Sequence, residues 1–108
     1  MKEDLLKIIE HYGVLKQLKH FQSEVFELNE AIIEASIKLR LLEGNPPKMV
    51  EPVVEELIQH ITEEIADVLV MLGQFINYYG IKNKDIKKFI DYKIKRQLRR
   101  IEDERKSE

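Results

Sequence analysis

Cysteine is missing from the 108-residue chain, so neither a disulfide framework nor a thiolate metal site can form. Long apolar runs are also missing, since the longest hydrophobic patches fall far short of the roughly 20 residues that cross a membrane. The N-terminus carries acidic residues early and has no uninterrupted apolar run, which is not the pattern of a signal peptide. These absences predict a soluble, cytoplasmic protein with no membrane partner.

Charge is nearly balanced overall but unevenly distributed. The formal net charge is −2, yet residues 1–81 hold 7 Lys/Arg against 14 Asp/Glu, and residues 82–108 hold 11 against 6. An acidic body followed by a basic segment suits either nucleic-acid binding or the placing of cations opposite the protein's own acidic site. A mixed-charge surface helix explains most of these residues equally well.

Strand-like alternation is absent, and helical spacing of apolar residues dominates throughout. A short first helix should end at Gly13, and a second should cover 14–42. The prolines after Gly44 end it, because proline lacks an amide donor. The stripe we expect it to bury consists of Val14, Leu18, Phe21, Val25, Leu28, Ile32, Ala35 and Leu39.

The third and fourth helices are expected after a linker at 43–51. Pro52 suits the first turn of the third helix, which should continue to Tyr79 and be capped by Gly80. Its expected buried stripe is Val53, Leu57, Ile61, Ile65, Val68, Leu72 and Phe75. Asn83 is a plausible N-cap for the fourth helix, and 102–108 should fray.

The chain therefore reads as one all-α domain over 1–108, similar to a four-helix bundle with two long helices. Broad apolar stripes in so short a chain should leave apolar surface exposed. We expect a second copy to cover it, which makes a homodimer the smallest assembly.

Two pairs of acids stand out on the long helices. Glu24 and Glu27 are three residues apart, as are Glu64 and Asp67, and each pair flanks the apolar stripe of its helix. If the two helices are neighbours, the four carboxylates face one another. Like charges in that arrangement repel, and a hard divalent cation such as Mg²⁺ relieves the repulsion while binding substrate phosphates. Two solvated helix faces are the simpler explanation.

Further polar residues are candidates for substrate contact. Gln17 and Gln74 share the acidic faces and could read the edge of a base. Lys93, Arg96 and Arg100 share one face of the fourth helix, where arginine suits bidentate phosphate contact. Surface pairing with neighbouring acids explains these cations about as well. His20 and His60 also share the acidic faces, and we expect them to be partly buried hydrogen-bonding groups.

The two acidic segments resemble motifs of the MazG-type all-α nucleoside triphosphate pyrophosphohydrolases, especially their short, phage-like, single-domain members. Gln22-Ser23-Glu24-Val25-Phe26-Glu27-Leu28 is similar to the Glu-Glu-x-x-Glu motif, and Glu63-Glu64-Ile65-Ala66-Asp67-Val68-Leu69 to the Glu-x-x-Asp motif. The resemblance extends over about 8–101. It includes Tyr12-Gly13, Gln17, Tyr79-Gly80-Ile81 and Lys93-x-x-Arg96-x-x-x-Arg100-Ile101.

The resemblance implies an enzyme that hydrolyses a nucleoside triphosphate to the monophosphate and pyrophosphate. Mg²⁺ is the implied cofactor, with Mn²⁺ as a substitute, and the implied ligands and catalytic residues are Glu24, Glu27, Glu64 and Asp67. It also implies that a dimer of dimers can form. Ser23 departs from the family, which has Glu there, and the change should weaken a second metal or the activation of water.

Two other functions remain open. The helices could form a non-catalytic dimerisation or interaction module whose acids are merely solvated. The basic C-terminal segment could instead serve a small nucleic-acid-binding regulator, although the acidic body and the lack of a helix-turn-helix spacing disfavour it. Glu-x-x-His pairs are absent, which disfavours a ferritin-like di-iron protein.

Overall fold

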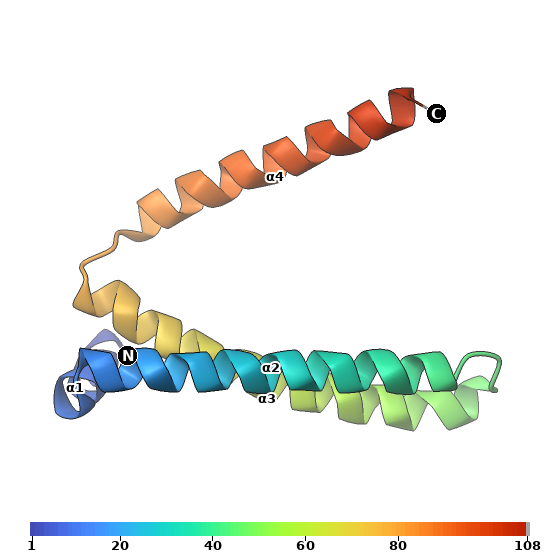
Figure 1. Ribbon diagram of the computed structural model, residues 1–108, viewed down its shortest axis with the longest axis horizontal. Coiled ribbons are helices and arrows are strands. Elements are labelled where there is room, and N and C mark those ends of the chain that lie inside the picture. The colour runs from blue at the N-terminus through green and yellow to red at the C-terminus, as the bar shows by residue number, and fades with distance from the viewer. Residues whose placement is uncertain (108) are drawn as a thin grey trace.

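Four helices make up the described part of a computed structural model of the chain, residues 1–107 (Figure 1). They are α1 (Lys2–Tyr12), α2 (Val14–Leu41), α3 (Pro47–Tyr78) and α4 (Asn83–Lys106). No strand occurs among these residues, so the all-α prediction is confirmed. Along the described chain, none of the helices is both long and apolar enough to cross a membrane.

Two glycines set helix boundaries where the sequence predicts them. Gly13, with φ of 89°, separates α1 from α2 and donates its N–H to the Ile9 carbonyl at 2.8 Å. Gly80, with φ of 65°, follows the C-cap of α3. The next amide, that of Ile81, donates to the Ile76 carbonyl at 2.9 Å, which completes the hydrogen bonding of a Schellman cap.

The predicted start of α3 is wrong. Pro46 is extended and occupies the N-cap, Pro47 takes the first helical position, and Pro52 lies inside the helix. The linker therefore shortens from 43–51 to 42–46. Pro52 lacks the amide that would bond to the carbonyl of Lys48, so α3 is missing one helical hydrogen bond near its start.

The limits of α4 also differ from the prediction. Lys82 rather than Asn83 is its N-cap, and no side chain caps that end. The helix continues to Lys106, so most of the segment expected to fray is helical. Residue 108 of that segment lies outside the described residues.

Helices α1, α2 and α3 pack together into a thin layer. The long helices α2 and α3 lie side by side and antiparallel, and α1 packs chiefly against α3 (Figure 1). A Cβ at Gly73 would lie 2.9 Å from the Leu5 Cδ1, so the missing side chain lets α1 approach closely. Among the described residues the buried apolar side chains are few: Ile9, Ala31, Ala35, Leu57 and Met71.

The fourth helix departs most from expectation. Within residues 1–107, α4 packs against none of the other three helices and extends away from them (Figure 1). A four-helix bundle is therefore not formed by a single chain. The sequence did not reveal this, because an apolar stripe on a helix shows that the helix needs a partner without showing which chain supplies it.

Several residues of the predicted buried stripes are exposed, because no helix of the described chain covers them. On α2, Phe21 and Leu28 are at least half buried, whereas Leu18, Val25, Ile32 and Leu39 are exposed. On α3, Ile65 and Leu72 are likewise exposed. The apolar residues of each long helix thus divide into a seam buried in this chain and a second stripe that this chain leaves uncovered.

Candidate functional site

The middle of the α2–α3 pair carries the same set of polar side chains twice. Each residue of the second set lies 40 positions after its counterpart: His20, Glu24 and Glu27 on α2, and His60, Glu64 and Asp67 on α3. Because α2 and α3 run antiparallel, the two sets meet in an approximately twofold arrangement. Of the four carboxylates expected to face one another, Glu24, Glu27 and Glu64 come together within one chain, and Asp67 is not part of that group.

Three of the predicted ligands form a compact cluster. Glu24, Glu27 and Glu64 each offer a carboxylate oxygen, and these oxygens all lie within 4.8 Å of one another. The side chains of Glu24 and Glu64 are only 13% and 16% exposed. The Oε2 atoms of both are buried and, within the described chain, have no hydrogen-bond partner. Two desolvated anionic oxygens without donors are unfavourable unless a cation or donor joins them.

The other oxygen of each buried glutamate has a partner. His20 Nε2 lies 3.3 Å from Glu24 Oε1, and His60 Nε2 lies 3.5 Å from Glu64 Oε1. Both imidazoles are about half exposed, so they lie between the carboxylates and solvent. Each histidine thus lies beside the Oε1 of one carboxylate, while the Oε2 of the same carboxylate is buried. The expected hydrogen-bonding role of the histidines stays a prediction.

Electrostatics at the cluster favour the protonated form of Glu24. Burial raises the pKa of the Glu24 carboxyl above its ordinary value, and the negative charges of Glu27 and Asp67 raise it further. His20 acts in the opposite direction and does not cancel these effects. Asp67, the fourth predicted ligand, is exposed, so its charge reaches Glu24 from the solvent side of the cluster.

A hollow of about 450 Å³ adjoins the cluster, with Glu24 and Asp67 in its wall. Gln17 and Gln74, only 5% and 1% exposed, also line it. Gln17 Nε2 donates to Gln74 Oε1 at 2.7 Å, and Gln74 Nε2 contacts the Met71 sulfur at 3.5 Å. The structure therefore brings the two predicted base-reading amides together beside the acids, where each holds the other in place.

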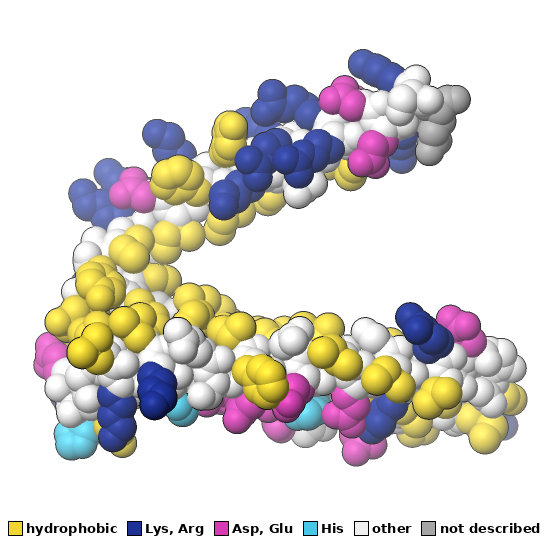
Figure 2. Space-filling model, viewed as in Figure 1, with side chains coloured by type: hydrophobic (Ala, Val, Ile, Leu, Met, Phe, Trp, Pro, Cys, Tyr) yellow, Lys and Arg dark blue, Asp and Glu magenta, His cyan; other side chains and the backbone are white. Residues whose placement is uncertain are grey.

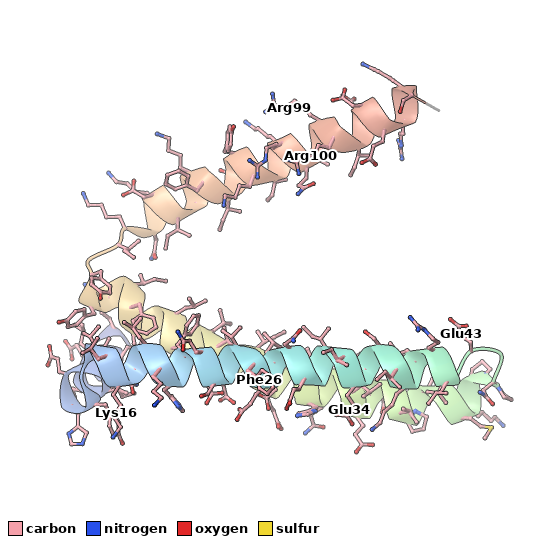
Figure 3. All side chains as sticks on the ribbon, viewed as in Figure 1. Lys16, Phe26, Glu34, Glu43, Arg99 and Arg100 are labelled. Carbon is pink, nitrogen blue, oxygen red and sulfur yellow. The ribbon has the colours of Figure 1, made fainter. Side chains whose placement is uncertain are left out.

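Lys16 also lines the hollow and was missed in the sequence. Its ammonium lies 5.3 Å from the centre of the Tyr12 ring, and Figure 3 shows its side chain near the end of the molecule where α1 meets α2. The sequence does contain a signal for Lys16. Lys16, His20 and Glu24 recur every four residues and therefore share one helical face.

The cations predicted on α4 are not brought to the acids. Lys93, Arg96 and Arg100 lie on the helix that packs against none of the others, and Figure 3 shows Arg100 well apart from the α2–α3 pair. The guanidinium of Arg96 lies instead 5.9 Å from the centre of the Tyr92 ring. Within one chain, Lys16 is the cation that shares the hollow with Glu24 and Asp67.

Ser23 is exposed on α2 next to the cluster. Its counterpart Glu63 is exposed on α3. The position at which Ser23 differs from the motif that this segment resembles is therefore an exposed one. No protein-family model, no curated protein and no solved structure matches this chain.

Proposed function

We propose that Glu24, Glu27 and Glu64 bind a divalent cation, with Asp67 beside them, and that the protein is a Mg²⁺-dependent nucleoside triphosphate pyrophosphohydrolase. The observation that carries the proposal is the convergence of three carboxylates from two helices, two of which bury an oxygen that has no hydrogen-bond partner. Solvated acids on helix surfaces do not require such burial. Mg²⁺, or Mn²⁺ in its place, takes oxygen ligands of this kind and retains waters that phosphates can replace.

The cation would supply Lewis-acid chemistry, polarising a phosphoryl oxygen and lowering the pKa of a bound water. Glu24 and Glu64, the more buried carboxylates, are suited to holding it. Glu27 is exposed and lies in the same cluster, so it can accept the proton of the attacking water and release it to solvent. Attack at the α-phosphorus would give the nucleoside monophosphate and pyrophosphate.

The hollow next to the cluster is where the rest of the nucleotide would lie. The Gln17 amide is suited to hydrogen bonding with a base edge, and Gln74 positions it through the 2.7 Å bond. Lys16 at the same wall can meet a phosphate. It takes the role first expected of Lys93, Arg96 and Arg100, which lie apart from the hollow in the single chain.

The test is to measure pyrophosphate released from a panel of nucleoside triphosphates, with Mg²⁺ and with a chelator. We expect Mg²⁺-dependent release that Glu64→Gln abolishes. Glu63→Gln is the matched control, since it removes an exposed carboxylate one residue away and should retain activity. Release by Glu64→Gln equal to that of the unaltered protein would refute the assignment.

One observation favours a second candidate, a non-catalytic helical interaction module. Within the described residues α4 packs on no other helix and apolar stripes are exposed, which supports association with a partner. The module predicts that Mg²⁺ neither binds nor stabilises the protein. Calorimetric titration with MgCl₂ separates the two candidates, because only the hydrolase requires a saturable site that Glu64→Gln removes.

A further inference from the structure

The uncovered apolar stripes of α2 and α3 follow one pattern. On α2 they are Leu18, Val25, Ile32 and Leu39, exposed by 39 to 46%. On α3 and its C-cap they are Ile58, Ile65, Leu72 and Tyr79, exposed by 38 to 58%, and each lies 40 positions after its counterpart. We call these eight residues the apolar face. Their spacing of seven is that of a helix seam that packs against further helices.

The apolar face lies on the opposite side of the α2–α3 layer from the acids. At about 100° per residue, Val25 is displaced to one side of Glu24, and Glu27 to the other. Ile65 and Asp67 bear the same relation to Glu64. Figure 2 shows hydrophobic side chains along the side of the layer turned toward α4, and acidic and histidine side chains along the other. Covering the apolar face would thus leave the acidic cluster open.

Helix α4 presents a matching stripe. Ile90, Ile94, Leu98 and Ile101 recur every three or four residues and are 47 to 57% exposed. In the described chain no other helix packs on them. Charged residues make up most of the rest of α4, with Phe89 and Tyr92 as exposed aromatic side chains away from the stripe.

The size of the exposed surface indicates how large the missing contact is. The chain exposes 9160 Å², whereas a compact monomer of 12.9 kDa exposes roughly 6,300 Å². Its radius of gyration is 18.8 Å, against about 13 Å for a compact domain of this length. Covering most of the excess in a dimer would bury an area typical of obligate homodimers, on the order of 2,000 to 5,000 Å² in total.

We propose that a second copy of this chain fills the space between α4 and the α2–α3 layer, so that α4 of each copy packs on the apolar face of the other. Each copy gives its α4 and receives that of the other, so the contact is reciprocal, as in a dimer with twofold symmetry.

Light scattering coupled to size-exclusion chromatography tests the exchange on the full chain. We expect the unaltered protein to be a dimer or a larger even assembly. Ile94→Asp on α4 and Ile65→Asp on the apolar face should each raise the dissociation constant at least about a hundredfold, because each places a charge in an apolar contact. Tyr92→Asp is the matched control, since Tyr92 is equally exposed but about 160° away from Ile94 around α4.

Several results would overturn the proposal. A monomer at about 100 μM protein would do so, whether extended or compact through closure of α4 onto its own chain. Equal dissociation of the Tyr92→Asp and Ile94→Asp variants would do so as well. If either aspartate variant loses its helical circular dichroism, the test is made on the unaltered protein instead. Its unfolding temperature should rise with protein concentration, and a constant unfolding temperature would contradict association.

Discussion

Glu24 on α2 and Glu64 on α3 each bury one carboxylate oxygen without a hydrogen-bond partner, while each sets the other oxygen within 3.5 Å of a histidine one turn earlier. The two side chains come from the two helices of an antiparallel pair and meet near its centre. In the metal-free protein this pairing is unfavourable, since it combines desolvation with repulsion between like charges. That cost is what the proposed cation would remove.

Glu64→Gln should stabilise the metal-free protein, because the substitution removes one of two facing charges while keeping the shape of the side chain. We expect a gain of about 1 kcal/mol in the free energy of unfolding, measured by urea denaturation with a chelator present. Added MgCl₂ should then stabilise the unaltered protein and leave the variant unchanged. Glu63→Gln, on the exposed side of the same turn, should shift neither measurement, and a variant less stable than the unaltered protein would count against facing charges.

The raised pKa of Glu24 makes the metal-free protein sensitive to pH. A carboxyl whose pKa is higher in the folded state binds its proton more tightly there than in the unfolded chain. The stabilisation by that proton is complete below the ordinary value of 4.5 and is lost as the pH rises through the raised folded pKa. We therefore expect the unfolding temperature, measured with a chelator, to fall across the window that begins at pH 4.5.

Mg²⁺ affinity should rise across the same window, because the cation must displace the Glu24 proton. Calorimetric titrations at several pH values measure this directly. Glu24→Asp keeps a titrating carboxylate on a shorter side chain, whereas Glu24→Gln removes the titrating group. If stability in chelator shows the same pH dependence in the Glu24→Gln variant, then another group is responsible for it.

The buried Gln17–Gln74 pair should behave as a coupled unit. Gln74→Leu leaves the Gln17 amide buried without its partner, which should cost about 1 to 3 kcal/mol in the free energy of unfolding. The double variant Gln17→Leu/Gln74→Leu should recover most of that loss, because no polar group is then left unpaired. Chemical denaturation of the two single variants and the double variant gives the coupling energy. Strictly additive losses would show that the amides act independently.

The start of α3 at Pro47 can be tested with two prolines. Pro52→Ala should stabilise the protein by up to about 3 kcal/mol, because alanine restores an amide donor inside the helix. Pro47→Ala should change stability by less than about 0.5 kcal/mol, since the amide of the first helical position has no acceptor in the helix. Thermal unfolding compares the two. Similar small effects for both variants would indicate that the regular helix begins only at Pro52.

Much of the architecture follows from local chemistry that a sequence displays. Gly13 and Gly80 end helices because their positive φ angles suit glycine, and helical spacing places Glu24 and Glu64 on facing sides of α2 and α3. The start of α3 did not follow, because Pro47 and Pro52 suit a first turn equally well. Only the extended backbone of Pro46 distinguishes them.

Other features depend on tertiary packing that spacing cannot determine. Val25 and Ile32 look like core residues, yet the seam of this chain passes through Glu24, Leu28 and Ala31. Lys93, Arg96 and Arg100 share a helical face, but that face belongs to a helix that meets no other in the chain. The spacing of four places Lys16 on the face of His20 and Glu24, but the hollow itself also has Ile8 and Tyr12 of α1 in its wall, and the packing of α1 is not specified by that spacing.

The most direct measurement is the release of pyrophosphate from nucleoside triphosphates by the unaltered protein and by Glu64→Gln, each with Mg²⁺ and with chelator. We predict release by the unaltered protein only with Mg²⁺, and at least about a thousandfold less by the variant. Calorimetry on the same samples should show a Mg²⁺ site in the first and none in the second. If neither triphosphate hydrolysis nor Mg²⁺ binding is found in the unaltered, folded protein, the carboxylate cluster is not a metal–phosphate site.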